Sequence, residues 1–144
     1  MSAASSPCKL AYPLPLASFS NLRQYVNSSS TFATAAASAA NSANNYLGLN
    51  GYLTNLTSAA EQTFQASVIT FASKPNLWIG AREVTTNGNW VWYDGPEAGT
   101  QILSSNYPTK TVVNGAYNNF NATEPNNNSG TTGADDCAVG NFTA

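Results

Sequence analysis

The feature that most constrains this fold is a pair of short apolar segments joined through an Asn-Gly pair. Residues 77–80 form a short apolar run of the kind found in buried strands, and residues 89–93 place two tryptophans two positions apart. The Asn-Gly pair at 87–88 fits a tight hairpin turn. Because side chains alternate along a strand, Trp90 and Trp92 share one face. The chain is therefore predicted to contain an antiparallel hairpin whose tryptophans enter a core, with a sugar-stacking platform as the alternative role.

A first helix is predicted over residues 29–45, well ahead of this hairpin. The segment is rich in alanine, and Phe32 and Ala36 recur in it at helical spacing. Ser30 or Thr31 is a candidate N-cap, and the Asn-Asn pair at 44–45 is a candidate end. Its small side chains indicate close packing against a sheet.

A short strand and a second helix are predicted to follow. Residues 52–56 alternate as a strand does, and Ser58 with Glu61 forms a capping box that opens the helix. Three apolar residues then fall on one helical face: Phe64, Val68 and Phe71. The helix is expected to stop near Ser73, ahead of a proline.

The chain after Thr100 is predicted to be a long loop that leads into a polar cluster and a last strand. Its residues are mainly Asn, Gly, Pro and Thr with scattered aromatics. Glu83 and Glu97 have no evident partner and are expected to be solvated. The whole order of elements predicts an α+β fold in which helices flank a small antiparallel sheet system.

Composition narrows the possible functions. A chain of 144 residues fits one domain, and its charged fraction of 8% is far below the usual quarter. The absence of histidine excludes His-based catalysis and His-ligated zinc, and the net charge of −2 offers nucleic acid or an anionic membrane no attraction. No apolar run is long enough to span a membrane, and no leader peptide is evident. We expect a mature or excised segment of a secreted or cell-surface protein.

Asparagine and cysteine residues add to the extracellular interpretation. The five Asn-x-Ser/Thr sequons, each a candidate glycosylation site, begin at Asn27, Asn55, Asn121, Asn127 and Asn141. Two cysteines are too few to define a disulfide framework. Cys137 could pair with Cys8 or with a cysteine beyond this chain.

Carboxylate and amide oxygens crowd together near the C-terminal end. Glu124, Pro125 and Asn126 are followed by Asp135 and Asp136. Ca²⁺ binds six to eight such oxygens, and a proline between two ligands, above all a cis-proline, restricts the backbone between them. The alternatives are an Asn-rich polar loop or, since glycosidases need two carboxylates, a catalytic acid and base at Glu124 and Asp135. No other feature supports catalysis, so a non-enzymatic chain is expected.

Four separated motifs together resemble the C-type lectin-like domain over residues 22–144. The segment 51–61 is similar to the family's strand and second-helix start, and 77–81 to its W-I-G strand. The segment 90–95 resembles its W-x-W-x-D-G hairpin, and Glu124 to Asn126 its E-P-N motif after an aromatic tract. Residues 1–21 remain an irregular lead-in.

The resemblance implies a fold of two helices flanking small antiparallel sheets, with a long loop region that binds Ca²⁺ and sugar. It implies that Glu124, Asn126 and Asp135 ligate Ca²⁺ and hold vicinal sugar hydroxyls of the mannose type. Asp136 matches a further, auxiliary metal ligand. The family's W-N-D segment and last cysteine would lie beyond Ala144, so the C-terminal part of the domain is expected to be missing.

The sequence therefore predicts a secreted, Ca²⁺-dependent carbohydrate-binding module with mannose-type glycans as partners. The alternative is a structural or adhesive module of an extracellular assembly that keeps the fold, contacts neighbouring extracellular proteins and binds no sugar. Neither interpretation involves nucleic acid or membrane insertion.

Overall fold

In the computed structural model, the described residues form two helices and one five-stranded antiparallel sheet. The predicted α+β class is confirmed, and a single sheet takes the place of the several small sheets that were expected. The described residues are 30–42, 46, 48–72, 76–84, 88–106, 109–125 and 137–141. The helices are α1 (Phe32–Ala40) and α2 (Ala59–Ala72). The strands are β1 (Asn76–Glu83), β2 (Asn89–Trp92), β3 (Gln101–Asn106), β4 (Thr109–Val112) and β5 (Cys137–Asn141). The expected lead-in at 1–21 lies outside the described residues.

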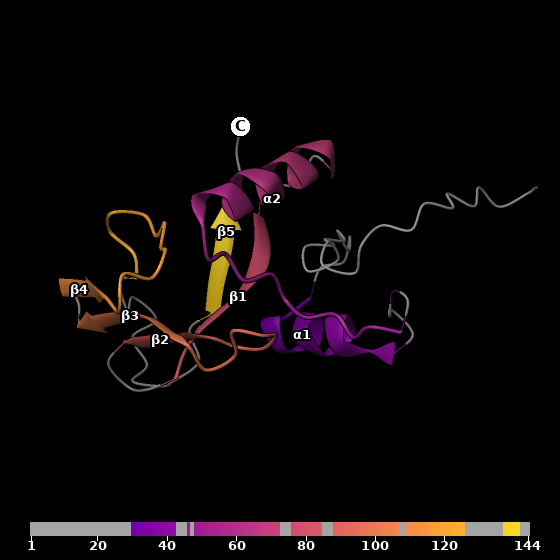
Figure 1. The fold of residues 1–144 in the computed structure, drawn as a ribbon, viewed down its shortest axis with the longest axis horizontal. Coiled ribbons are helices and arrows are strands. Elements are labelled where there is room, and N and C mark those ends of the chain that lie inside the picture. Colours follow the sequence, from indigo (N-terminus) through magenta and orange to yellow (C-terminus); the bar gives the residue numbers. More distant parts are fainter. Residues whose placement is uncertain are drawn as a thin grey trace, which may run out of the picture.

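The strands form one sheet in the order β4-β3-β2-β1-β5, and every neighbouring pair is antiparallel. In Figure 1, α2 lies at one end of the β1–β5 pair and α1 beside the other end of β1, while β3 and β4 extend away from α1. Among the described strands, the last therefore pairs with the first, which brings residues 137–141 beside residues 76–82.

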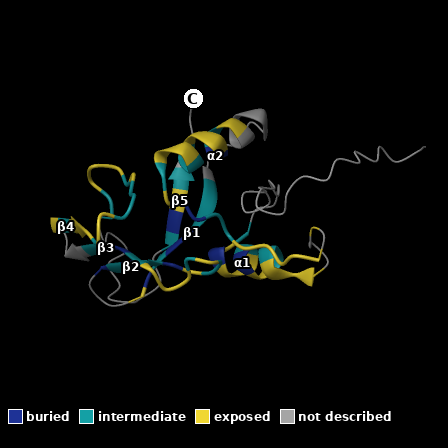
Figure 2. Ribbon diagram, viewed as in Figure 1, coloured by how far each residue is buried: buried dark blue, intermediate teal, exposed yellow. Residues whose placement is uncertain are grey.

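The predicted antiparallel strand pair is present as β1 and β2, and its two tryptophans are in the core. Asn87 of the expected turn lies outside the described residues. Trp90 and Trp92 are 5% and 4% exposed, so the core role is confirmed for both. The residues buried with them come from four different segments: Leu56, Ala81, Ile102, Leu103 and Ala138. Figure 2 shows the buried parts gathered where β1, β2, β3 and β5 meet, while the outer side of α2 is exposed.

The predicted long loop after Thr100 was wrong, because residues 101–106 and 109–112 form the paired strands β3 and β4. The sequence conceals β3 because Ile102 and Leu103 are adjacent and both buried, at 3% and 0% exposure, instead of alternating. The pairing of β2 with β3 shifts register between Trp90 and Val91. Such a bulge breaks the two-residue period on which strand prediction depends.

Helix α1 begins where the sequence places it but ends early. Thr31 is the N-cap, and its Oγ1 accepts the amide of Thr34 at 3.2 Å. The helix ends at Ala40 with Asn41 as C-cap, not at the later Asn-Asn pair. Its buried Phe32 packs edge-to-face with Trp78 and Tyr93, at ring-centroid distances of 5.9 and 5.2 Å, which attaches α1 to the sheet.

The predicted capping interaction at the start of α2 is present, but the predicted apolar face is not buried at Phe64. Ser58 Oγ accepts the Glu61 amide at 3.2 Å, and a Glu61 carboxylate oxygen accepts the amide and hydroxyl of Thr57, each at 2.7 Å. Phe64, however, is 47% exposed, whereas Gln65 is 6% exposed. The side chains at 68 and 71 lie outside the described set.

The predicted strand at residues 52–56 was also wrong, because no regular strand forms there. The segment contributes one ladder-like bond to the sheet, from the Gly80 amide to the Thr54 carbonyl at 2.8 Å. Side-chain contacts, and not strand pairing, attach this segment to the rest of the domain. Leu56 is part of the core, and Thr54 Oγ1 donates to Gln65 Oε1 at 3.3 Å.

Candidate functional site

The candidate site lies in the loop at residues 113–125, which follows β4 and contains Glu124. The loop leaves the sheet through a tight turn in which Asn114 and Gly115 have φ of 51° and 68°. Asn and Gly are the residues that tolerate this left-handed region best. The Val113 amide still donates to the Ile102 carbonyl at 3.1 Å, so the start of the loop stays bonded to β3.

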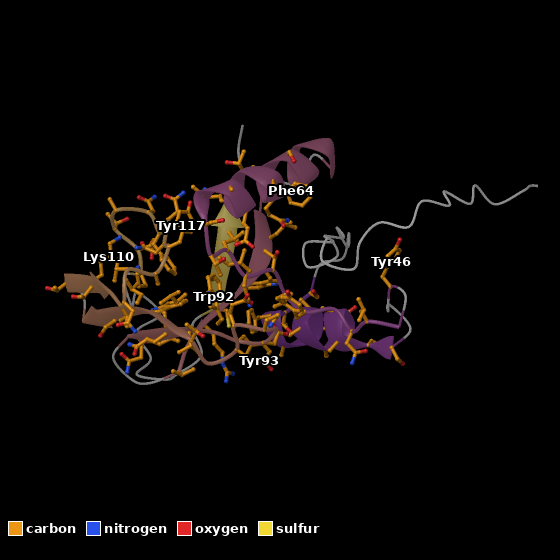
Figure 3. The ribbon with its side chains drawn as sticks, viewed as in Figure 1. Tyr46, Phe64, Trp92, Tyr93, Lys110 and Tyr117 are labelled. Atoms are coloured by element: carbon orange, nitrogen blue, oxygen red, sulfur yellow. The ribbon has the colours of Figure 1, made fainter. Side chains whose placement is uncertain are left out.

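Two aromatic residues attach the middle of the loop to the body of the domain. Phe120 packs edge-to-face on the buried Trp90, with ring centroids 5.4 Å apart. The hydroxyl of Tyr117 donates to Gln62 Oε1 on α2 at 2.7 Å. Figure 3 shows Tyr117 beside the start of α2, with Lys110 on the strand side of the same loop. The loop is therefore held from both a helix and the core.

A lysine from β4 holds the far end of the loop. Lys110 Nζ donates to the main-chain carbonyls of Asn121 and Glu124, each at 2.9 Å. The Glu124 amide in turn donates to the Asn121 carbonyl at 2.9 Å, which closes a four-residue turn at 121–124. The Glu124–Pro125 peptide bond is cis.

Of the four expected metal ligands, only Glu124 lies within the described residues, where it is half-buried. Asn126, Asp135 and Asp136 lie outside that part of the chain. Cys137, which follows Asp136 in the sequence, is the first residue of β5 and lies opposite Arg82 of β1 in the sheet register. The residue that follows Asp135 and Asp136 is therefore fixed in the sheet.

The donor types fit Ca²⁺, because carboxylate and amide oxygens are its preferred ligands in proteins. Within the described ranges, no three His, Cys, Asp or Glu side chains gather closely enough to hold a metal ion. The described part of the site therefore supplies Glu124, and the remaining ligands would have to come from Asn126, Asp135 and Asp136.

The candidate glycosylation sites differ in how accessible their asparagine side chains are. Asn121 is exposed, and Asn141 lies in β5 opposite Asn76. Asn55 is only 3% exposed, and its Nδ2, the atom that would carry a glycan, donates to the Asp94 carbonyl at 2.9 Å and to Glu97 Oε2 at 3.0 Å. The folded chain leaves no room for a glycan there. Asn27 and Asn127 lie outside the described residues.

Of the two glutamates expected to be solvated, Glu83 is buried and Glu97 is only partly exposed. Glu83 is 6% exposed, and the Glu97 carboxylate is a partner of the buried Asn55 amide. In the same turn, burial raises the pKa of Asp94 above its usual value, and hydrogen bonds from the Leu53 and Asp94 amides partly oppose the shift. The Asp94 carbonyl and the Glu97 carboxylate therefore both bind Asn55 at the turn after β2.

Lys110 and Gln62 were not identified from the sequence as residues that shape the site, and Tyr117 was used only as part of the aromatic tract of the family resemblance. The aromatic tract before Glu124 was a usable signal for Tyr117 and Phe120. Lys110 carries no pattern of its own, because it meets Glu124 only through the return of the loop onto β4, 14 residues later.

Comparison with known proteins agrees with this architecture. Residues 36–141 match the family model described as the lectin C-type domain. The chain is 38% identical over 106 residues to halomucin of Haloquadratum walsbyi, a match that covers 74% of this chain and 1% of that protein. No solved structure matches. No helix in the described residues is long and apolar enough to cross a membrane. The motifs, the fold and the family match together show that the chain belongs to the C-type lectin domain family.

Proposed function

We propose that this domain binds carbohydrate through Ca²⁺, with Glu124, Asn126 and Asp135 as shared ligands of the ion and the sugar and with Asp136 as an auxiliary ligand. Members of the C-type lectin family are in general carbohydrate-binding, non-enzymatic modules. The observation that supports the proposal most is the anchored 113–125 loop, in which Lys110 fixes the main chain on which Glu124 stands.

The chemistry of these side chains suits a pair of sugar hydroxyls. A carboxylate only accepts hydrogen bonds, whereas an asparagine amide both donates and accepts. Two vicinal hydroxyls could donate to Glu124 and accept from Asn126, while their oxygens complete the coordination of the ion. Ca²⁺, when bound, would supply the positive charge that orients both hydroxyl oxygens. We infer a preference for equatorial vicinal hydroxyls, as in mannose, from the similarity of this motif to the E-P-N pattern.

Titration calorimetry tests this function. We expect heat on adding Ca²⁺, and then on adding a mannoside but not a galactoside, with the mannoside signal abolished by a chelator. Glu124→Gln keeps the shape and removes the charge, and we expect it to weaken Ca²⁺ binding at least tenfold, or about 1.4 kcal/mol.

Glu61→Gln is the matched control, since the carboxylate of Glu61 is bound to Thr57 at the start of α2. It should leave both titrations unchanged. An absence of Ca²⁺ heat, or equal Ca²⁺ binding by wild type and Glu124→Gln, would reject the proposed mechanism.

A second candidate is an adhesive or structural module of an extracellular assembly. Two apolar side chains on different elements favour it, since Val139 of β5 is 51% exposed and Phe64 of α2 is 47% exposed. The chain also corresponds to a very small part of halomucin. Sedimentation at increasing protein concentration would test it: self-association that Val139→Ser abolishes, without any glycan binding, would favour this second function. We propose an extracellular or cell-surface location under either function.

A further inference from the structure

The ammonium group of Lys110 binds main-chain carbonyls of the candidate loop, as a bound cation would. It stands in β4, where the register pairs it with Ser105 of β3, so the sheet fixes its main chain. It is half-buried, whereas the other three residues of this strand are exposed. Its ammonium group then reaches the carbonyl oxygens of Asn121 and Glu124 at 2.9 Å each.

We propose that Lys110 is the positioning residue of the glycan site, holding the 121–124 turn in its binding shape before Ca²⁺ or sugar arrives. Two carbonyl dipoles converge on its positive charge, as they would on a bound metal ion. This inference rests on the proposed function for the identity of the ligand, but the loop geometry that supports it is independent of that ligand.

The other described anchors do not replace this contact. Phe120 and Tyr117 attach the earlier part of the loop to Trp90 and Gln62. The Lys110 bonds instead reach both ends of the turn, the carbonyl of its first residue and the carbonyl of its last. Hydrogen bonds from a charged donor are roughly twice as strong as neutral ones, so they suit the task of ordering an exposed turn.

Positioning by Lys110 has a consequence for affinity. A loop that is already ordered spends less conformational entropy on binding, which strengthens the complex. A positive charge near the site also repels Ca²⁺, and this opposing effect is screened by salt whereas the ordering effect is not. The two effects can therefore be separated experimentally.

Hydrogen exchange of the Glu124 amide, which bonds to the Asn121 carbonyl, reports the turn directly. It is measured by NMR on the whole chain, with a chelator and then with Ca²⁺. In chelator we expect the wild-type amide to be protected. Lys110→Met, which keeps the length and removes the charge, should lose at least tenfold in protection, or about 1.4 kcal/mol, because both hydrogen bonds from the charged donor are then absent.

Two further variants control this experiment. Lys110→Arg keeps a charged donor and should retain most of the protection. Because Met and Arg both keep a long aliphatic side chain at this position, the difference between the two variants reports the charged donor and not the packing. Thr111→Ala changes the exposed neighbour on β4 and should match wild type. Protection of the Leu103 amide in β3 shows that each variant is folded. Ca²⁺ should bind Lys110→Met about tenfold more weakly, also at high salt.

Equal Glu124 protection in wild type and Lys110→Met would overturn the proposal. So would tighter Ca²⁺ binding by Lys110→Met with an unchanged turn, because the lysine would then act only as a repelling charge. If wild type gives no Ca²⁺ heat yet Lys110→Met loses the turn, the proposed function fails and the positioning role of Lys110 stands.

Discussion

Asn55 offers the sharpest test of how this fold is held, because the sequence marks it as a glycan acceptor and the structure buries it. Its Nδ2 donates to the Asp94 carbonyl and to a Glu97 carboxylate oxygen. Asn55→Ala removes both bonds and leaves two acceptors without that donor. A neutral bond contributes about 1 kcal/mol and one to a charged group about 1.5–3 kcal/mol. Because Glu97 is partly exposed, we take the lower end and expect a loss of about 2–3 kcal/mol.

Urea unfolding followed by tryptophan fluorescence measures this loss. With a slope of about 2 kcal/mol per molar, typical of small domains, the midpoint should fall by about 1–1.5 M. Asn119→Ala, at an exposed loop position, is the control and should stay within about 0.5 kcal/mol of wild type. Equal stability of the two variants, or a glycan found on Asn55 of the folded protein by mass spectrometry, would refute the reasoning.

Three further predictions concern other parts of the fold. Ser58→Ala removes the N-cap of α2 and should cost about 1 kcal/mol in urea unfolding, whereas Ser58→Thr should restore most of it. Gly80→Ala places a Cβ against the side chain of Asn55 and 2.9 Å from the Leu53 carbonyl, so we expect a loss of about 1–3 kcal/mol or more; wild-type stability would disprove the close approach. The pKa of Asp94 is raised in the folded state, so the native chain binds more protons than the unfolded chain just above the ordinary aspartate pKa, and stability due to this group falls as pH rises through that window. Asp94→Asn should flatten that part of the stability profile, and an unchanged slope would contradict the burial of this carboxyl group.

Local sequence patterns were sufficient to predict the strand whose side chains alternate regularly between buried and exposed, and the first residues of the two helices. The tryptophans of β2 alternate, so both their strand and their burial were predicted correctly. The cap residues Thr31 and Ser58 placed the starts of both helices, because capping depends on hydrogen bonds within one turn. The same local logic failed at β3, where a register shift buries Ile102 and Leu103 together.

The sequence determined the family, the α+β class and the oxygen-rich segment around Glu124, because each motif or element that indicates them is a pattern within a few neighbouring residues. Only the tertiary structure decided which polar residues are structural and which remain candidates for binding. Asn55 and Glu97 meet across 42 positions and Lys110 meets Glu124 across 14, and no local pattern encodes such contacts. They arise because burial of the sheet's apolar residues brings distant polar groups together, and a buried polar group must then find a partner.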